Sequence, residues 1–144
     1  MCRLLFLASD RPLPEIPWDP LNPSFHVRRP QAGEGTVETH FSKPHIYYVG
    51  SSQMCGCGFA IPDSPIEDTY DQTEYESAVE DLARFVDYLR NVLTPFDTFE
   101  LYQAWDGALT RRPRRTVDLA LRDVDGGTFG ADEPLLFRVT RRTV

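Results

Sequence analysis

A single amphipathic segment near the middle of the 144-residue chain constrains its fold more than any other feature. Thr73 and Glu76 fit the S/T-x-x-E capping box, in which two side chains satisfy backbone amides that the first helical turn leaves unpaired. Pro95 ends the pattern, because proline disfavours helical geometry in the residue before it. Apolar residues recur between these signals at spacings of three and four, namely Tyr75, Val79, Leu82, Val86, Leu89 and Leu93. The sequence therefore predicts one long helix over about 74–93 whose apolar stripe faces the core.

Segments of strand length lie on both sides of this helix, without the strand-helix alternation that produces parallel sheets. These segments are 2–9, 36–41, 44–50 and 54–61 before the helix, and 98–105, 116–124 and 135–140 after it. We therefore predict a mainly antiparallel sheet of about five to seven strands packed against the helix. Chain length favours a single α+β domain over residues 1–144.

Two features predict where individual strands lie in this sheet. Residues 2–9 are apolar on both alternating faces, which is typical of a strand in the middle of a sheet. Residues 44–50 and 54–61 are joined by a polar link of hairpin length, so we expect them to pair as antiparallel neighbours.

Residues 10–35 form a proline-rich segment. Proline disfavours both helices and central strands, so neither is expected here. Its prolines are Pro12, Pro14, Pro17, Pro20, Pro23 and Pro30. We predict a long surface loop that is held against the body of the protein by the side chains of Trp18, Leu21 and Phe25.

Charge and hydropathy exclude several classes of function. A net charge of −7 disfavours binding to nucleic acid and to anionic membrane surfaces. The apolar run over residues 4–8 is too short for a secretory signal, and no segment approaches the ~20 apolar residues of a membrane span. We therefore expect a cytoplasmic protein in which the cysteines are free thiols, ligands or nucleophiles.

The negative charge is concentrated in residues 63–81, which hold eight carboxylates and no basic residue. One interpretation is a solvated face whose carboxylates also favour the positive end of the helix dipole. The other is a surface that docks a basic protein or supports self-association, through Glu67, Asp68, Asp71 and Glu74. On this basis we expect a non-catalytic interaction domain, with metal or thiol chemistry and anion binding as alternatives.

A basic cluster lies between the strands predicted at 98–105 and 116–124. It consists of Arg111, Arg112, Arg114 and Arg115. Guanidinium groups at this density can bind a phosphate or carboxylate, whereas a run this short is also typical of a solvated loop.

The string Cys55-Gly56-Cys57 is the most unusual in the chain, and two interpretations of it stay open. On a strand, Cys55 and Cys57 share an apolar face with Phe59, so both thiols would be buried in the core. Alternatively, Cys55, Cys57 and Cys2 form a zinc site with His40, His45 or His26, since zinc takes thiolate and imidazole ligands. Zinc sites typically use a C-x₂₋₄-C spacing, so the second interpretation needs Gly56 to bend the chain.

A third interpretation concerns Cys2 as a catalytic nucleophile. Met1-Cys2-Arg3-Leu4-Leu5 resembles the start of class II glutamine amidotransferase domains. The resemblance implies that removal of Met1 leaves Cys2 as an N-terminal nucleophile whose own amine serves as the base. It covers five residues, and neither a glutamine-binding arginine motif nor an Asn-Gly oxyanion segment follows.

Overall fold

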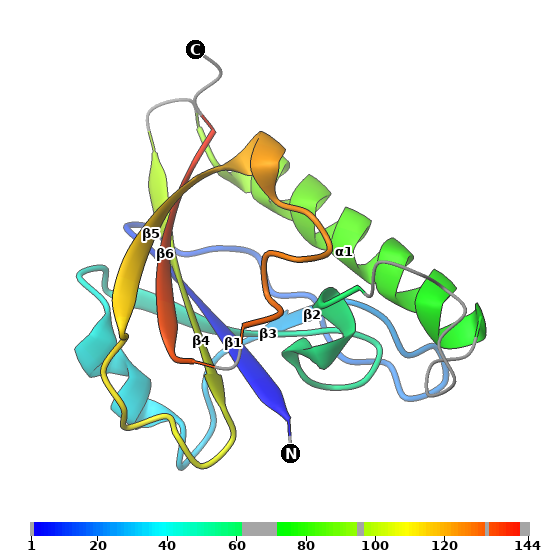
Figure 1. Ribbon diagram of the computed structural model, residues 1–144, viewed down its shortest axis with the longest axis horizontal. Coiled ribbons are helices and arrows are strands. Elements are labelled where there is room, and N and C mark those ends of the chain that lie inside the picture. The colour runs from blue at the N-terminus through cyan, green and yellow to red at the C-terminus, as the bar shows by residue number, and fades with distance from the viewer. Residues whose placement is uncertain (1, 62–71, 95–96, 132, 142–144) are drawn as a thin grey trace.

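A sheet runs through the molecule, and the long helix α1 lies across one of its faces (Figure 1). The computed structural model describes residues 2–61, 72–94, 97–131 and 133–141. Within these residues the chain forms one six-stranded sheet in the order β2-β3-β1-β4-β6-β5. Its elements are β1 (Arg3–Ser9), β2 (His26–Arg28), β3 (His45–Gly50), α1 (Gln72–Val92), β4 (Thr98–Trp105), β5 (Arg115–Ala120) and β6 (Leu135–Thr140). The predicted α+β class is confirmed.

Strand β1 lies in the middle of the sheet, antiparallel to β3 on one side and to β4 on the other. Leu5 and Leu7 face the core beneath α1, while Phe6 and Ala8 face a second core on the opposite side. The central position predicted from the apolar character of β1 is therefore confirmed. One pair departs from the antiparallel pattern: β5 runs parallel to β6, after a crossover that contains the short 3-10 helix η3 (Leu121–Asp123).

The core beneath α1 is built around a group of aromatic rings. Phe25, Phe59, Phe85 and Phe129 meet there, with ring centroids 5.1 to 6.5 Å apart. These rings come from four separate segments, so they join the proline-rich loop, η2, α1 and the segment between η3 and β6 to one another. Val79 is 43% exposed, so this member of the predicted apolar stripe faces solvent.

The helix begins slightly earlier than the sequence predicts. It starts at Gln72, which puts Thr73 within the first turn instead of ahead of it. It ends at Val92, as the signal at Pro95 predicts. None of the described helices combines the length and the apolar character that crossing a bilayer requires.

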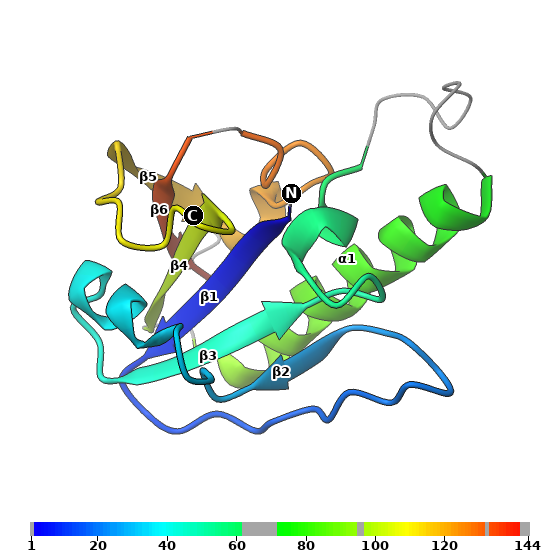
Figure 2. The same cartoon turned by 90° about the horizontal axis from the view of Figure 1, so that it is seen from below.

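Residues 36–41 do not form the strand that their alternation predicts. They belong to a 3-10 helix, η1 (Gly35–His40), which packs Val37 into the second core, where Leu109 from the loop after β4 also lies. Both segments cover the sheet face that turns away from α1 (Figure 2).

The hairpin predicted between residues 44–50 and 54–61 is also wrong. β3 forms as expected, but both of its edges are occupied, by β1 on one side and by β2 on the other. The chain after β3 instead makes a tight turn and a short 3-10 helix, η2 (Gly56–Phe59). Cys55 and Cys57 therefore do not share a strand face.

The proline-rich segment is a long loop, as predicted, apart from the three residues of β2. Phe25 is buried in the core, and the Trp18 ring packs against His26. The expectation for Leu21 is wrong, because its side chain is 94% exposed. Leu13 is buried in its place, and its backbone amide donates to the hydroxyl of Tyr47 over 2.7 Å.

Candidate metal centre

The three cysteines meet at one end of β1. The sulfur atoms of Cys2, Cys55 and Cys57 all lie within 4.8 Å of one another. Cys2 comes directly before β1, and the other two follow β3. Because β1 and β3 are antiparallel, with Leu5 opposite Val49, the start of β1 lies beside the end of β3 (Figure 2). The topology therefore brings together thiols that are more than fifty positions apart in the sequence.

The turn that carries Cys55 is fixed by hydrogen bonds around the buried Ser51. The amide and the hydroxyl of Ser51 both donate to the carbonyl oxygen of Cys55, over 2.9 and 2.7 Å. Met54 adopts a left-handed conformation with φ of 70°, which lets the chain reverse direction in so few residues. Asp81, reaching from α1, accepts the amide of Ser52 over 2.9 Å. The turn is thus anchored both internally and to the helix.

Two glycines allow η2 to pack closely against its neighbours. A Cβ atom on Gly56 would lie 3.3 Å from the carbonyl oxygen of Arg3 and from the Cβ of Leu5, both on β1. A Cβ atom on Gly58 would lie 2.3 Å from the hydroxyl oxygen of Ser51. Both positions are glycine because other parts of the chain occupy the space that a side chain would need.

Replacing Gly58 by alanine is expected to destabilise the fold by about 2 kcal/mol, because the added methyl group overpacks a rigid site. Ser51 is fully buried and its hydroxyl is already hydrogen-bonded, so it has little freedom to move away. Gly35→Ala is the matched control, because nothing lies within 4 Å of its Cβ position. Urea unfolding of both variants measures the difference, and equal stabilities would contradict the close packing of η2.

The environment of the cluster makes one of the three thiols unusually acidic. A hydrogen bond from the Cys55 thiol, together with one from the Arg3 amide and the positive charge of Arg3, lowers the pKa of Cys57 to about 6. The Arg3 amide nitrogen lies 3.1 Å from the Cys57 sulfur. Donation to Cys57 and burial raise the pKa of Cys55. At neutral pH the pair therefore holds one thiolate, centred on Cys57.

Alkylation of Cys57 in the metal-free protein is expected to follow this lowered pKa. The thiolate is the reactive form, so the rate with iodoacetamide should rise with pH and reach half of its maximum near pH 6. The rate is measured by mass spectrometry, with fragment ions assigning the label to position 57. The control is the same chain in guanidinium chloride, where the midpoint should return to about 8.5. Identical midpoints in the two states would contradict the assignment.

The histidines proposed as zinc ligands do not join the cysteines. His40 lies in η1, where its Nε2 atom is 2.7 Å from the carbonyl oxygen of Leu109. His45 begins β3 and pairs with Ser9, at the opposite end of β1 from Cys2. His26 is buried, and this burial lowers its pKa. Among the described residues, the metal-ligating side chains at the cluster are the three cysteines.

Two supporting groups were not anticipated from the sequence. The Arg3 amide gives no sequence signal, since any residue there except proline supplies the same donor. Asp81 does give a sequence signal, because it shares the buried side of the helix with Ala78, Leu82 and Phe85. A carboxylate in that position needs hydrogen-bond partners. Its buried position also removes it from the proposed acidic docking surface.

The remaining residues proposed for that docking surface are only partly described. Glu67, Asp68 and Asp71 lie outside the described residues, and Glu74 is exposed on the first turn of α1. Docking of a basic partner on residues 63–81 stays a prediction.

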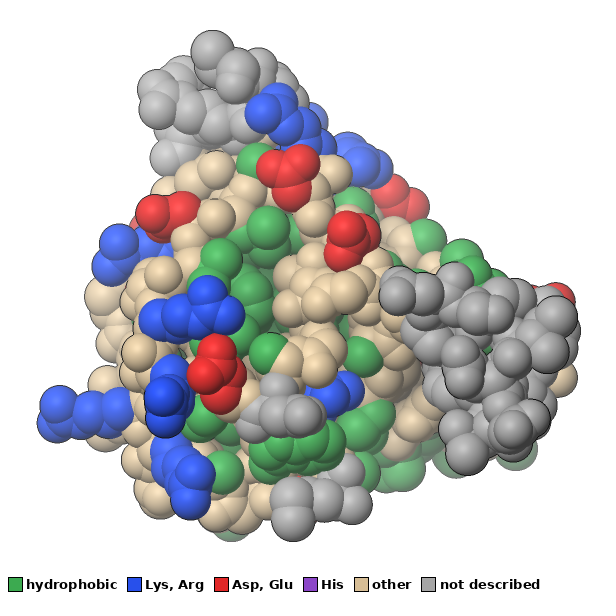
Figure 3. All heavy atoms as spheres, in the orientation of Figure 1, with side chains coloured by type: hydrophobic (Ala, Val, Ile, Leu, Met, Phe, Trp, Pro, Cys, Tyr) green, Lys and Arg blue, Asp and Glu red, His purple; other side chains and the backbone are tan. Residues whose placement is uncertain are grey.

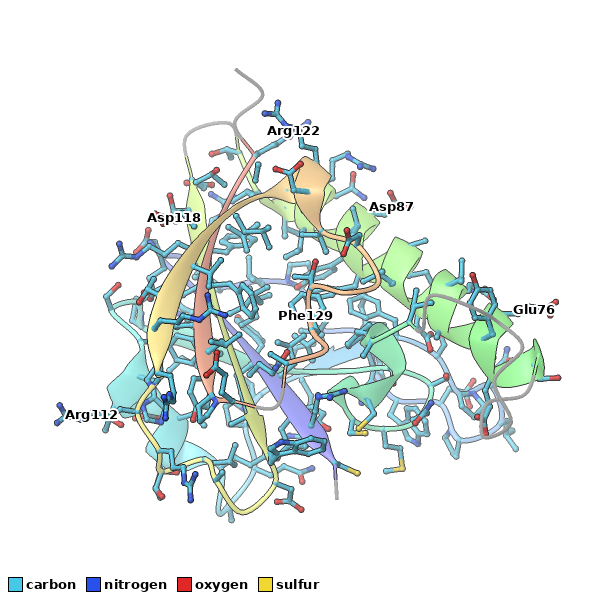
Figure 4. All side chains as sticks on the ribbon, viewed as in Figure 1. Glu76, Asp87, Arg112, Asp118, Arg122 and Phe129 are labelled. Atoms are coloured by element: carbon cyan, nitrogen blue, oxygen red, sulfur yellow. The ribbon has the colours of Figure 1, made fainter. Side chains whose placement is uncertain are left out.

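The arginine cluster lies on the loop before β5 and includes the first residue of that strand, Arg115. Arg114 and Arg115 both pair with Glu133, over 3.5 and 3.2 Å. The side chain of Arg112 extends away from the body of the protein (Figure 4). Basic side chains gather along this edge in the space-filling view (Figure 3).

The catalytic interpretation of Cys2 stays a prediction. Cys2 is exposed, so reagents reach its thiol. Within the described part of the chain, neither a histidine nor a carboxylate joins the cysteine cluster, so its side chains offer no general base other than a second thiolate.

Comparison of the chain with models of protein families, with curated proteins and with solved structures gave no match. The interpretation of the site therefore follows from its own geometry and chemistry.

Proposed function

We propose that this chain is a zinc-binding domain that holds one Zn²⁺ ion through the thiolates of Cys2, Cys55 and Cys57. The observation that carries the proposal is the convergence of three sulfur atoms within 4.8 Å. Tetrahedral zinc with Zn–S bonds of about 2.3 Å places its sulfur ligands about 3.8 Å apart. The sulfur atoms thus need only a small inward movement to bind the ion.

The chemistry of the donors favours a soft or borderline metal ion. Three thiolates suit zinc or Cu(I), whereas Mg²⁺ and Ca²⁺ prefer oxygen ligands. The pKa of Cys57 is lowered to about 6, whereas burial and donation to Cys57 raise the pKa of Cys55, so binding has to displace the proton of the Cys55 thiol. The Arg3 amide donates a hydrogen bond to Cys57. Hydrogen bonds of this kind, from groups that do not bind the metal themselves, orient the ligands of a metal ion.

Three ligands from the described part of the chain leave one tetrahedral position for an external ligand. Sites with three protein ligands and one exchangeable position are typical of zinc that takes part in chemistry, whereas structural zinc usually has four protein ligands. Cys2 is exposed, so solvent reaches the cysteine cluster at this thiol.

The test is elemental analysis of the native protein combined with thiol titration. The expected result is one zinc ion for each chain, with three thiols that are protected from alkylation until a chelator removes the metal. Protein that takes up no stoichiometric zinc after reconstitution, and whose thiols react equally with and without added zinc, would overturn the proposal.

A further inference from the structure

A hollow lies on the sheet face that turns away from α1, near the edge formed by β5. It has a volume of about 670 Å³ and is lined by Thr39, His40, Thr110, Arg112, Pro113, Thr116 and Leu136. These residues supply three hydroxyl groups, an imidazole and a guanidinium group. Within the described part of the chain, no acidic residue lines it. The lining therefore combines hydroxyl groups and one cation with the apolar side chains of Pro113 and Leu136.

The loop that forms one wall of this hollow is held firmly against the sheet. The hydroxyl of Tyr102 donates to the carbonyl oxygen of Arg111 over 2.6 Å. His40 stacks on the ring of Tyr102, with centroids 4.3 Å apart, and its Nε2 atom donates to the carbonyl oxygen of Leu109. The backbone amide of Arg114 donates to the carbonyl oxygen of Pro134, next to β6. The wall is therefore preorganised, which reduces the entropic cost of binding a ligand there.

The charge of the arginine cluster is only partly neutralised. Glu133 pairs with both Arg114 and Arg115. Arg111 and Arg112 have no ion pair with a described residue. Arg112 lines the hollow and its side chain extends outward (Figure 4), so its guanidinium is free to change position by rotation about the side-chain bonds.

We propose that this hollow binds the phosphate group of a small phosphate monoester. Arg112 supplies a charge-assisted contact to the phosphate oxygens, and the hydroxyls of Thr110 and Thr116 donate further hydrogen bonds. The volume exceeds what a bare phosphate fills, and the apolar side chains of Leu136 and Pro113 suit the organic part of an ester. This site is separate from the cysteine cluster and does not depend on the proposed zinc function.

The experiment titrates the ¹⁵N-labelled full chain with inorganic phosphate and, separately, with phenyl phosphate. We expect saturable shifts of the amide resonances of residues 39–40, 110–112 and 114–116, with tighter binding of the ester. Arg112→Gln should weaken the binding of phenyl phosphate about tenfold, as expected for loss of one charge-assisted contact. Thr116→Val should weaken it less, since it removes one neutral hydrogen bond and keeps the shape of the side chain.

The matched control is Arg122→Gln, which removes the same charge from an exposed position of η3, away from the hollow (Figure 4). Unchanged affinity in this variant supports a defined site. Equal weakening in Arg112→Gln and Arg122→Gln would overturn the proposal, since it would indicate a general effect of net charge. Shifts that do not saturate with either phosphate compound would overturn it as well, and tighter binding of inorganic phosphate would show that the ester part is wrong.

Discussion

Replacing Cys57 by serine is expected to lower the affinity for zinc by at least about 100-fold. Loss of a group that only hydrogen-bonds to a metal ligand typically costs less than this, and Cys57 is itself a proposed ligand. The pKa of Cys57 is lowered to about 6, so the variant loses a ligand that binds with little proton displacement at pH 7.5. Serine preserves the size of the side chain but does not supply a thiolate. The affinity is measured at pH 7.5 by competition with a chromophoric zinc chelator.

Two further variants make this test specific. Cys2→Ser changes an exposed side chain, so it removes a ligand without disturbing the core, and it should also lower the affinity strongly. His45→Gln is the control, because His45 lies at the opposite end of β1 and should leave the affinity unchanged. Wild-type affinity in Cys2→Ser, with circular dichroism showing the same fold, would contradict a three-thiolate site.

Replacing Asp81 by asparagine is expected to destabilise the fold by about 3 kcal/mol, the scale of lost hydrogen bonds to a buried charge. Asp81 is 3% exposed, and its two carboxylate oxygens accept the amides of Phe25 and Ser52, over 3.1 and 2.9 Å. Asparagine has one carbonyl oxygen, so its NH₂ group would face one of these amides donor to donor. Denaturant unfolding measures the loss.

Asp87→Asn is the matched control for this substitution. Asp87 lies on the same helix, is 66% exposed and pairs with Arg90. Its replacement should change stability by no more than about 0.5 kcal/mol. If both variants lost the same stability, the two hydrogen bonds to Asp81 would not be the cause.

The sequence predicts the regular elements of this fold correctly where a long periodic pattern is compatible with only one type of secondary structure. The helix and the strands β4 and β6 form where expected, because their apolar residues repeat with the period of the structure that buries them. The segments at 36–41 and 54–61 are too short to distinguish a strand from a 3-10 turn by alternation. Whether residues 54–61 form a strand depends on the strand order, because both edges of β3 are already paired with other strands.

The sequence indicates which residues form the candidate site but not how they are arranged in space. Three cysteines suggest a shared site, and the mid-sheet position of β1 places Cys2 near the segment after β3. The residues that complete the arrangement act through long-range contacts, such as the Arg3 amide bonded to Cys57. The imidazole ligand that one interpretation takes from His40, His45 or His26 does not join the three cysteines, and the sequence does not show which end of a strand a loop reaches.

The antiparallel pairing of β1 with β3 also determines when the cysteine cluster exists. Arg3 and Cys57 are 54 positions apart, so during synthesis Cys2 stays apart from the other two thiols until the chain through Cys57 has emerged and β3 has paired with β1. Because the three thiols come together only in the folded chain, binding of the proposed zinc ion would favour that state and add to its stability through mass action. Supply of the metal would then influence how much of the newly made protein stays folded.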